Sequence, residues 1–204
     1  MTVLRGGRTV ICICCERKKK MNKALILMAD GFEEIEGLAV VDILRRGGIT
    51  IDMVSIYDNS TIKGSHDIVI SSDKNISDIN EDEYDIIIIP GGQPGTNNIK
   101  GSDKAKEMIL HFYSAGKYVA AICAAPTVLG MLGILEGKRA CCYEGLENGL
   151  TGAVISYDNV VKDGKIITSR GMGTAVEFGL AILSAIKGDD AGKAMSKAIM
   201  IKEK

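Results

Sequence analysis

The chain has 204 residues, a formal net charge of −1, 24 glycines, 3 prolines and no tryptophan. This length suits one domain with a full hydrophobic core, and the balanced charge gives no electrostatic footprint for nucleic acid or for an anionic membrane surface. Because no apolar run approaches the roughly 20 residues of a membrane span, a membrane protein is not indicated either.

Residues 1–20 differ in composition from the rest of the chain, with a short apolar patch between basic residues. The patch is too short for a membrane span and lacks the cleavage site of a secretory signal. We interpret this segment as a disordered extension, or as the product of a start codon upstream of Met21. Palmitoylation of Cys14 or Cys15 is an alternative.

From Met21 onward, short apolar runs alternate with segments of helical periodicity. Residues 24–29 form a continuous apolar run that predicts a strand covered on both faces. The spacing of residues 35–45 predicts a helix that ends at Gly47–Gly48. Further strands are expected at residues 49–56, 66–70, 84–89, 118–122, 139–142, 160–161 and 166–168, and further helices at 105–114, 126–132, 175–186 and after Asp190. This alternation predicts an α/β sandwich in which residues 21–204 form one domain.

Three expected strands run into segments that could carry chemistry. The first runs into an acidic segment, residues 30–36, the strand at 84–89 runs into a Gly-Gly loop, residues 90–95, and the strand at 118–122 runs into Cys123. Because ligands bind at the carboxyl ends of the strands in open α/β sheets, the three segments would converge on one crevice if these strands are neighbours.

Cys123 stands at a sharp turn from a strand to a helix. The unpaired N–H groups and the dipole of a helix N-terminus favour thiolate over thiol, so a reactive cysteine is one interpretation. The alternative is a buried cysteine that acts as a small hydrophobic residue.

Gly91 and Gly92 would let the backbone approach a ligand, and their N–H groups could form an oxyanion hole together with that of Ala124. A simple loop is the alternative. The three glutamates of residues 33–36 could only stabilise a helix N-terminus, or one of them could exchange a proton with the thiol.

The other cysteines and the histidines suggest no further site. Cys12, Cys14 and Cys15 are crowded near the start and Cys141 and Cys142 are adjacent, which does not suggest a disulfide framework. With only two histidines and no paired C-x-x-C, no metal site is expected. Neither His66 nor His111 is well placed for a Cys–His hydrolase, and a reducing, cytoplasmic setting is the simplest interpretation.

Four segments in this order resemble the ThiJ/PfpI superfamily, in its DJ-one-like branch, over about residues 22–202. They are AAICAAP at 120–126, IPGG at 89–92, GFEEIE at 31–36 and TSRGMGTA at 168–175. The resemblance implies a flavodoxin-like three-layer α/β/α sandwich with a mostly parallel sheet, similar to class I glutamine amidotransferases. It also implies a homodimer and an activity that needs no cofactor.

The resemblance implies site residues as well. Cys123 takes the position of the reactive cysteine and Glu36 that of the glutamate that shares its proton. Gly92 and Ala124 take the positions of the backbone donors, and Gly91 and Tyr143 are candidates for a supporting role beside them. Tyr143 stands where many relatives have a histidine, which disfavours a cysteine protease. Met172 replaces a proline of many relatives, a change expected to affect the stiffness of its loop.

The functions that the resemblance implies fall into two classes. The leading expectation is a cysteine-dependent enzyme acting on small carbonyl metabolites, a glyoxalase III-type conversion of methylglyoxal to lactate with deglycase activity as a variant. The alternative is an oxidative-stress sensor or holdase chaperone that works through oxidation of Cys123.

Overall fold

The computed structural model of the protein describes residues 23–201, so the expectations for residues 1–20 lie outside the described residues. Its centre is a seven-stranded sheet in the order β10-β11-β7-β6-β1-β2-β5. All neighbouring strands are parallel except β10, which pairs with β11 in an antiparallel hairpin. The strands are β1 (Lys23–Met28), β2 (Thr50–Ser55), β5 (Lys74–Asn75), β6 (Ile86–Ile89), β7 (Tyr118–Ile122), β10 (Val160–Asp163) and β11 (Ile166–Ser169).

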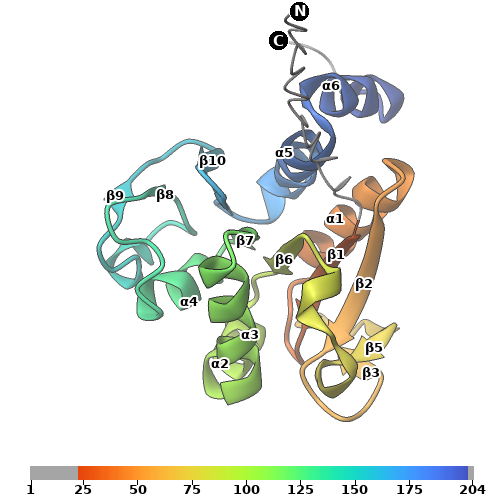
Figure 1. The fold of residues 1–204 in the computed structure, drawn as a ribbon, viewed down its shortest axis with the longest axis vertical. Helices are drawn as coiled ribbons and strands as arrows, with labels where there is room; N and C mark the ends of the chain where they lie inside the picture. Colours follow the sequence, from red (N-terminus) through yellow and green to blue (C-terminus); the bar gives the residue numbers. More distant parts are fainter. Residues whose placement is uncertain (1–22, 202–204) are drawn as a thin grey trace, which may run out of the picture.

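Helices cover both faces of this sheet (Figure 1). The helices α2 (Gln93–Gly101), α3 (Asp103–Ser114) and α4 (Pro126–Met131) lie on one face, and α1 (Glu34–Arg46), α5 (Ala175–Lys187) and α6 (Asp189–Ala198) lie on the other. The predicted flavodoxin-like α/β sandwich with a mostly parallel sheet is therefore confirmed. No helix among residues 23–201 is long and apolar enough to cross a membrane.

The continuous apolar runs of the central strands follow from this layering. In β1, Leu25 and Leu27 pack against the α3 side of the sheet, whereas Ile26 and Met28 pack against the α1 and α5 side. Because successive side chains of a strand point to opposite faces, a strand covered on both faces must be apolar at every position. All four residues are fully buried.

Two short sheets lie outside the central one. The strands β3 (Thr61–Lys63) and β4 (Val69–Ser71) form an antiparallel hairpin, and β8 (Arg139–Ala140) pairs in parallel with β9 (Val154–Ile155). The strand expected at 66–70 therefore begins later than predicted, because His66 lies in the turn of the hairpin. The strand expected at 139–142 ends at Ala140, which leaves both following cysteines beyond it.

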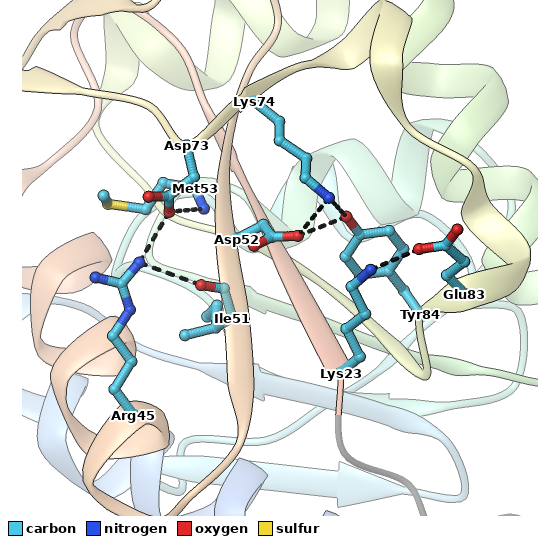
Figure 2. Close-up of polar contacts among 9 residues, drawn as sticks. All are labelled: Lys23, Arg45, Ile51, Asp52, Met53, Asp73, Lys74, Glu83 and Tyr84. Carbon is cyan, nitrogen blue, oxygen red and sulfur yellow. Dashed lines mark hydrogen bonds and ion pairs between the residues drawn. The ribbon is translucent and has the colours of Figure 1, made fainter.

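A polar network ties the first strand to the edge of the sheet (Figure 2). The buried Tyr84 precedes β6, donates its hydroxyl to Asp52 on β2 at 2.6 Å and accepts a hydrogen bond from Lys74 on β5 at 3.0 Å. Lys23, at the start of β1, lies over the Tyr84 ring and forms an ion pair with Glu83 at 2.6 Å. A phenol that is almost fully buried needs such partners, so the network compensates the desolvation of Tyr84.

Figure 2 also shows a second set of contacts, centred on Asp73. The carboxylate accepts from Arg45 of α1 at 2.8 Å and from the backbone N–H of Met53 at 2.9 Å. Arg45 also donates to the carbonyl of Ile51 at 3.2 Å. These contacts fasten the C-terminal end of α1 to the edge of the sheet, and the N-terminal end of the same helix carries the acidic segment.

Candidate active site

The three segments singled out in the sequence meet at one edge of the sheet. The strands β7, β6 and β1 are consecutive parallel neighbours, so their carboxyl ends lie side by side. Cys123 follows β7, the Gly91–Gly92 pair follows β6, and α1 with its glutamates follows β1. The condition set by the sequence, that these strands be neighbours, is fulfilled.

Cys123 adopts a left-handed backbone conformation, with φ of 64°. Its N–H donates to the carbonyl of Ser169 at 2.9 Å, and its own carbonyl accepts from the N–H of Tyr143 at 2.8 Å. A non-glycine residue in this region costs on the order of 1–3 kcal/mol and persists only where its surroundings enforce it. The two backbone hydrogen bonds, to the end of β11 and to the segment after β8, provide that constraint and fix the sharp turn at Cys123.

Glu36 is the acidic residue that faces the thiol. It lies in the first turn of α1, and its side chain is 1% exposed. Its backbone N–H donates to Glu33 Oε2 at 2.7 Å, and its Oε2 accepts from the N–H of Gly91 at 2.9 Å. Burial raises the pKa of Glu36 to about 7, although hydrogen bonds from Cys123 and Gly91 oppose this shift. Glu36 therefore changes its protonation state near neutral pH.

The surroundings of the Cys123 thiol act on its pKa in both directions. Burial raises its pKa to about 12, with the charge and the hydrogen bond of Glu36 as further causes, while the N–H groups of Gly92 and Ala124 lower it. The helix that follows has only six residues and begins at Pro126, so its dipole offsets little of the rise in pKa that burial causes. Burial and the facing Glu36 carboxyl thus oppose the expected preference for thiolate at Cys123.

Gly91 and Gly92 are needed because there is no space for a side chain. A Cβ on Gly91 would collide with Glu36 Oε2 and lie 2.5 Å from the Cβ of Cys123. Gly92 has φ of 90°, and a Cβ there would lie 2.6 Å from the N atom of Glu33. Bare backbone therefore lies beside Cys123 and Glu36, and its expected approach to a ligand stays a prediction.

Cys123 is partly exposed to a pocket of about 270 Å³. The other lining residues are Gln93, Ala124, Tyr143, Glu144, Gly145 and Leu146. Tyr143 is 55% exposed and forms part of the wall. The pocket is large enough for a small molecule, and Cys123 is part of its wall.

The histidines have other partners, one of which the sequence did not reveal. His66 donates its backbone N–H to the buried Glu34 at 2.7 Å, and its Nδ1 lies 2.9 Å from the same carboxylate. Burial alone would raise the pKa of Glu34, but the hydrogen bonds from His66 and Ser65 lower it to about 2. His111 lies on α3, and its Nε2 is 3.4 Å from Asp82. The His66–Glu34 contact instead fastens the β3–β4 hairpin to the start of α1.

A group with metal-ligand spacing occurs at the same place. Potential ligand atoms of Glu33, Glu34 and His66 lie within 4.8 Å of one another. The Glu34 carboxylate, however, accepts hydrogen bonds from Ser65 and His66, and Glu33 caps α1. These contacts account for the cluster without an ion.

Comparison with known proteins shows the family of this chain. The model of the DJ-1/PfpI family matches residues 22–185. Protein dj-1beta of Drosophila melanogaster is 35% identical over 180 residues, covering 87% of this chain and 96% of that protein. Protein DJ-1 homolog B of Arabidopsis thaliana is 32% identical over 201 residues, covering 98% of this chain and 46% of that protein. The structure described as Toxoplasma gondii DJ-1, oxidized, has a TM-score of 0.85 and 32% identity, and the match covers 89% of this chain and all of that one. The chain belongs to the DJ-1/PfpI family.

Proposed function

We propose that the protein is a cofactor-independent enzyme that converts small α-oxoaldehydes such as methylglyoxal to 2-hydroxy acids, with Cys123 as nucleophile and Glu36 as acid and base. The observation that carries the proposal is the position of the Glu36 carboxyl, which lies between the N–H of Gly91 and the thiol of Cys123. A carboxyl with a pKa of about 7 can both accept and return a proton at neutral pH.

In the first step the sulfur of Cys123 attacks the aldehyde carbon. The ionised Glu36 takes the thiol proton as the S–C bond forms, so no free thiolate is required. The negative charge that develops on the aldehyde oxygen is held by the N–H groups of Gly92 and Ala124, which already point toward the sulfur. Glu36 then gives the proton to this oxygen, which yields a neutral hemithioacetal and restores the carboxylate.

In the second step Glu36 moves a proton between two carbons. The carboxylate removes the hydrogen of the former aldehyde carbon to form an enediolate, and the proton of the former aldehyde hydroxyl passes to the oxygen of the neighbouring carbon. Glu36 then returns its proton to that neighbouring carbon. The product is a thioester of the 2-hydroxy acid. Water then cleaves the thioester, releases the acid and restores the thiol, so the net change is the addition of one water to the α-oxoaldehyde.

The test is the turnover of methylglyoxal by the wild-type protein and by Cys123→Ser and Glu36→Gln, with Cys141→Ser and Glu107→Gln as controls. The first two variants should fall to background and the controls should retain activity. Since the reactive form carries an ionised Glu36, kcat/KM should rise with pH through about 7 and then level off. Turnover of methylglyoxal by Cys123→Ser at the wild-type rate would contradict the mechanism.

A second candidate function is the sensing of oxidants. Two equivalents of hydrogen peroxide would convert the thiol of Cys123 to a sulfinate, each giving one oxygen atom to the sulfur and leaving as water. The N–H groups of Gly92 and Ala124 and a protonated Glu36 would then donate to the new oxygen atoms. Mass spectrometry after mild peroxide treatment should show a gain of about 32 Da at Cys123 before any other cysteine. Equal oxidation of all cysteines would contradict selective sensing. Deglycase and holdase activities are further variants that use the same thiol.

A homodimer in the cytoplasm is the proposed working form. Three apolar residues are unusually exposed beside the His66–Glu34 contact, namely Ile35 at 50%, Ile68 at 52% and Val69 at 59%. They come from the start of α1 and from the β3–β4 hairpin, which the His66–Glu34 contact joins. Burial of this apolar surface against a second copy would remove it from water, which supports a dimer that forms next to the site.

A further inference from the structure

A second hollow borders the Cys123 pocket. It has a volume of about 360 Å³ and is formed largely by the loop of residues 170–174, which follows β11. Tyr143 and Glu144 line both hollows, so the two hollows adjoin. The mechanism above uses none of the residues of this loop.

The loop also lies close to the reacting carboxyl. A Cβ built on Gly171 would lie 3.9 Å from Glu36 Oε1 and 3.4 Å from Cδ2 of Tyr143. Gly171, which lines the second hollow, therefore also lies near the Glu36 carboxyl. Tyr143 is the residue that a ligand occupying both hollows would have to pass.

Arg170 and Glu144 are the charged residues that line the second hollow. The guanidinium of Arg170 is one-third exposed, and its Nη2 lies 3.7 Å from Glu144 Oε2, beyond hydrogen-bond distance. Glu144 is 85% exposed, so this ion pair is weak and an incoming anion can replace it. A guanidinium presents several N–H donors in a planar fork that matches the two oxygen atoms of a carboxylate.

We propose that the hollow at Arg170 binds a carboxylate at the far end of the substrate, so that the site prefers α-oxoaldehydes with a negatively charged tail over methylglyoxal. This inference rests on the proposed function for the reaction, but not for the binding of the tail. Methylglyoxal ends in a methyl group and makes no use of Arg170. Tyr143, in the wall between the two hollows, would lie along the chain that joins the aldehyde to the carboxylate.

The test compares 4,5-dioxopentanoate, an α-oxoaldehyde with a carboxylate tail, with methylglyoxal. The measured quantity is the ratio of the two kcat/KM values. Arg170→Gln should lower this ratio about tenfold, the effect of losing one charge-assisted hydrogen bond at a partly exposed site. Arg170→Lys should lower it less, because the charge remains while the fork is lost. Glu144→Gln should raise it, because the competing carboxylate is removed.

The matched control is Arg139→Gln. Arg139 is exposed and paired with Asp158 at 3.0 Å, outside both hollows. Its removal changes the net charge by the same amount and should leave the ratio unchanged. A ratio that stays within twofold in Arg170→Gln, or that falls equally in Arg139→Gln, overturns the proposal.

A second measurement does not depend on turnover. Succinate should slow the labelling of Cys123 by iodoacetamide in the wild-type protein but not in Arg170→Gln, and the neutral succinamide should slow it in neither. Equal labelling rates with and without succinate in the wild-type protein overturn the carboxylate site. Protection by succinate in a protein without turnover of either aldehyde would support the site and refute the proposed reaction, so the two failures can be told apart.

Discussion

Replacement of Glu36 by glutamine should change how the stability of the protein depends on pH. The pKa of Glu36 is about 7 in the folded protein, against an ordinary value of 4.5. Between these two pH values the folded state binds more protons than the unfolded state, so the free energy of unfolding falls as pH rises. Since one pKa unit is worth about 1.4 kcal/mol, the wild-type protein should lose about 3 kcal/mol from this group between pH 4.5 and 8.

Glutamine imitates the protonated carboxyl and has no charge to desolvate. The free energy of unfolding of Glu36→Gln, relative to that of the wild type, should therefore rise across this pH range by about the same 3 kcal/mol. Urea unfolding followed by circular dichroism at pH 5, 6, 7 and 8 measures the difference, and titration of His66 is common to both proteins and cancels. The control is Glu107→Gln, at an exposed position. Its free energy of unfolding should change with pH in the same way as that of the wild type. If the difference in free energy of unfolding between Glu36→Gln and the wild type changes by less than about 1 kcal/mol from pH 5 to 8, the raised pKa is refuted.

Three further predictions concern the surroundings of the site. Glu34, with a pKa of about 2, stabilises the fold above pH 4.5 and loses this contribution as the pH falls. The free energies of unfolding of the wild type and of Glu34→Gln should therefore converge as the pH approaches 2. A difference that stays constant with pH would contradict the lowered pKa. Gly91→Ala should reduce kcat/KM for methylglyoxal at least about tenfold, because displacement of Glu36 spoils the geometry of proton transfer, whereas Gly101→Ala, with open space around it, should not. Val69→Asp should be a monomer by light scattering, and a variant that remains dimeric would show that the copies meet elsewhere.

The position of the site could be predicted because it follows from the order of buried strands. Apolar runs mark parallel strands, and the carboxyl ends of neighbouring parallel strands share one edge, which brings Cys123, Gly91 and Glu36 together. The helix at Gln93–Gly101 was missed because Pro94 and Gly95 are typical of a loop. A proline is tolerated in the first turn of a helix, where its missing N–H has no intrahelical partner.

The protonation of the thiol could not be predicted because it depends on quantities that a sequence does not show. A cysteine beside a helix N-terminus gains stabilisation of its thiolate, but burial and a facing carboxylate act in the opposite direction and are larger at Cys123. The contact between Glu34 and His66 was hidden for a related reason. It joins residues 32 positions apart through the fold of the β3–β4 hairpin.

The left-handed backbone of Cys123 has a consequence for how variants of this protein would be selected. Glycine is the residue best suited to this conformation, so Cys123→Gly would relieve strain at the same time as it removes the thiol. A screen for thermal stability alone would then enrich proteins that have lost the sulfur. A selection for turnover, in contrast, would retain cysteine at this strained turn.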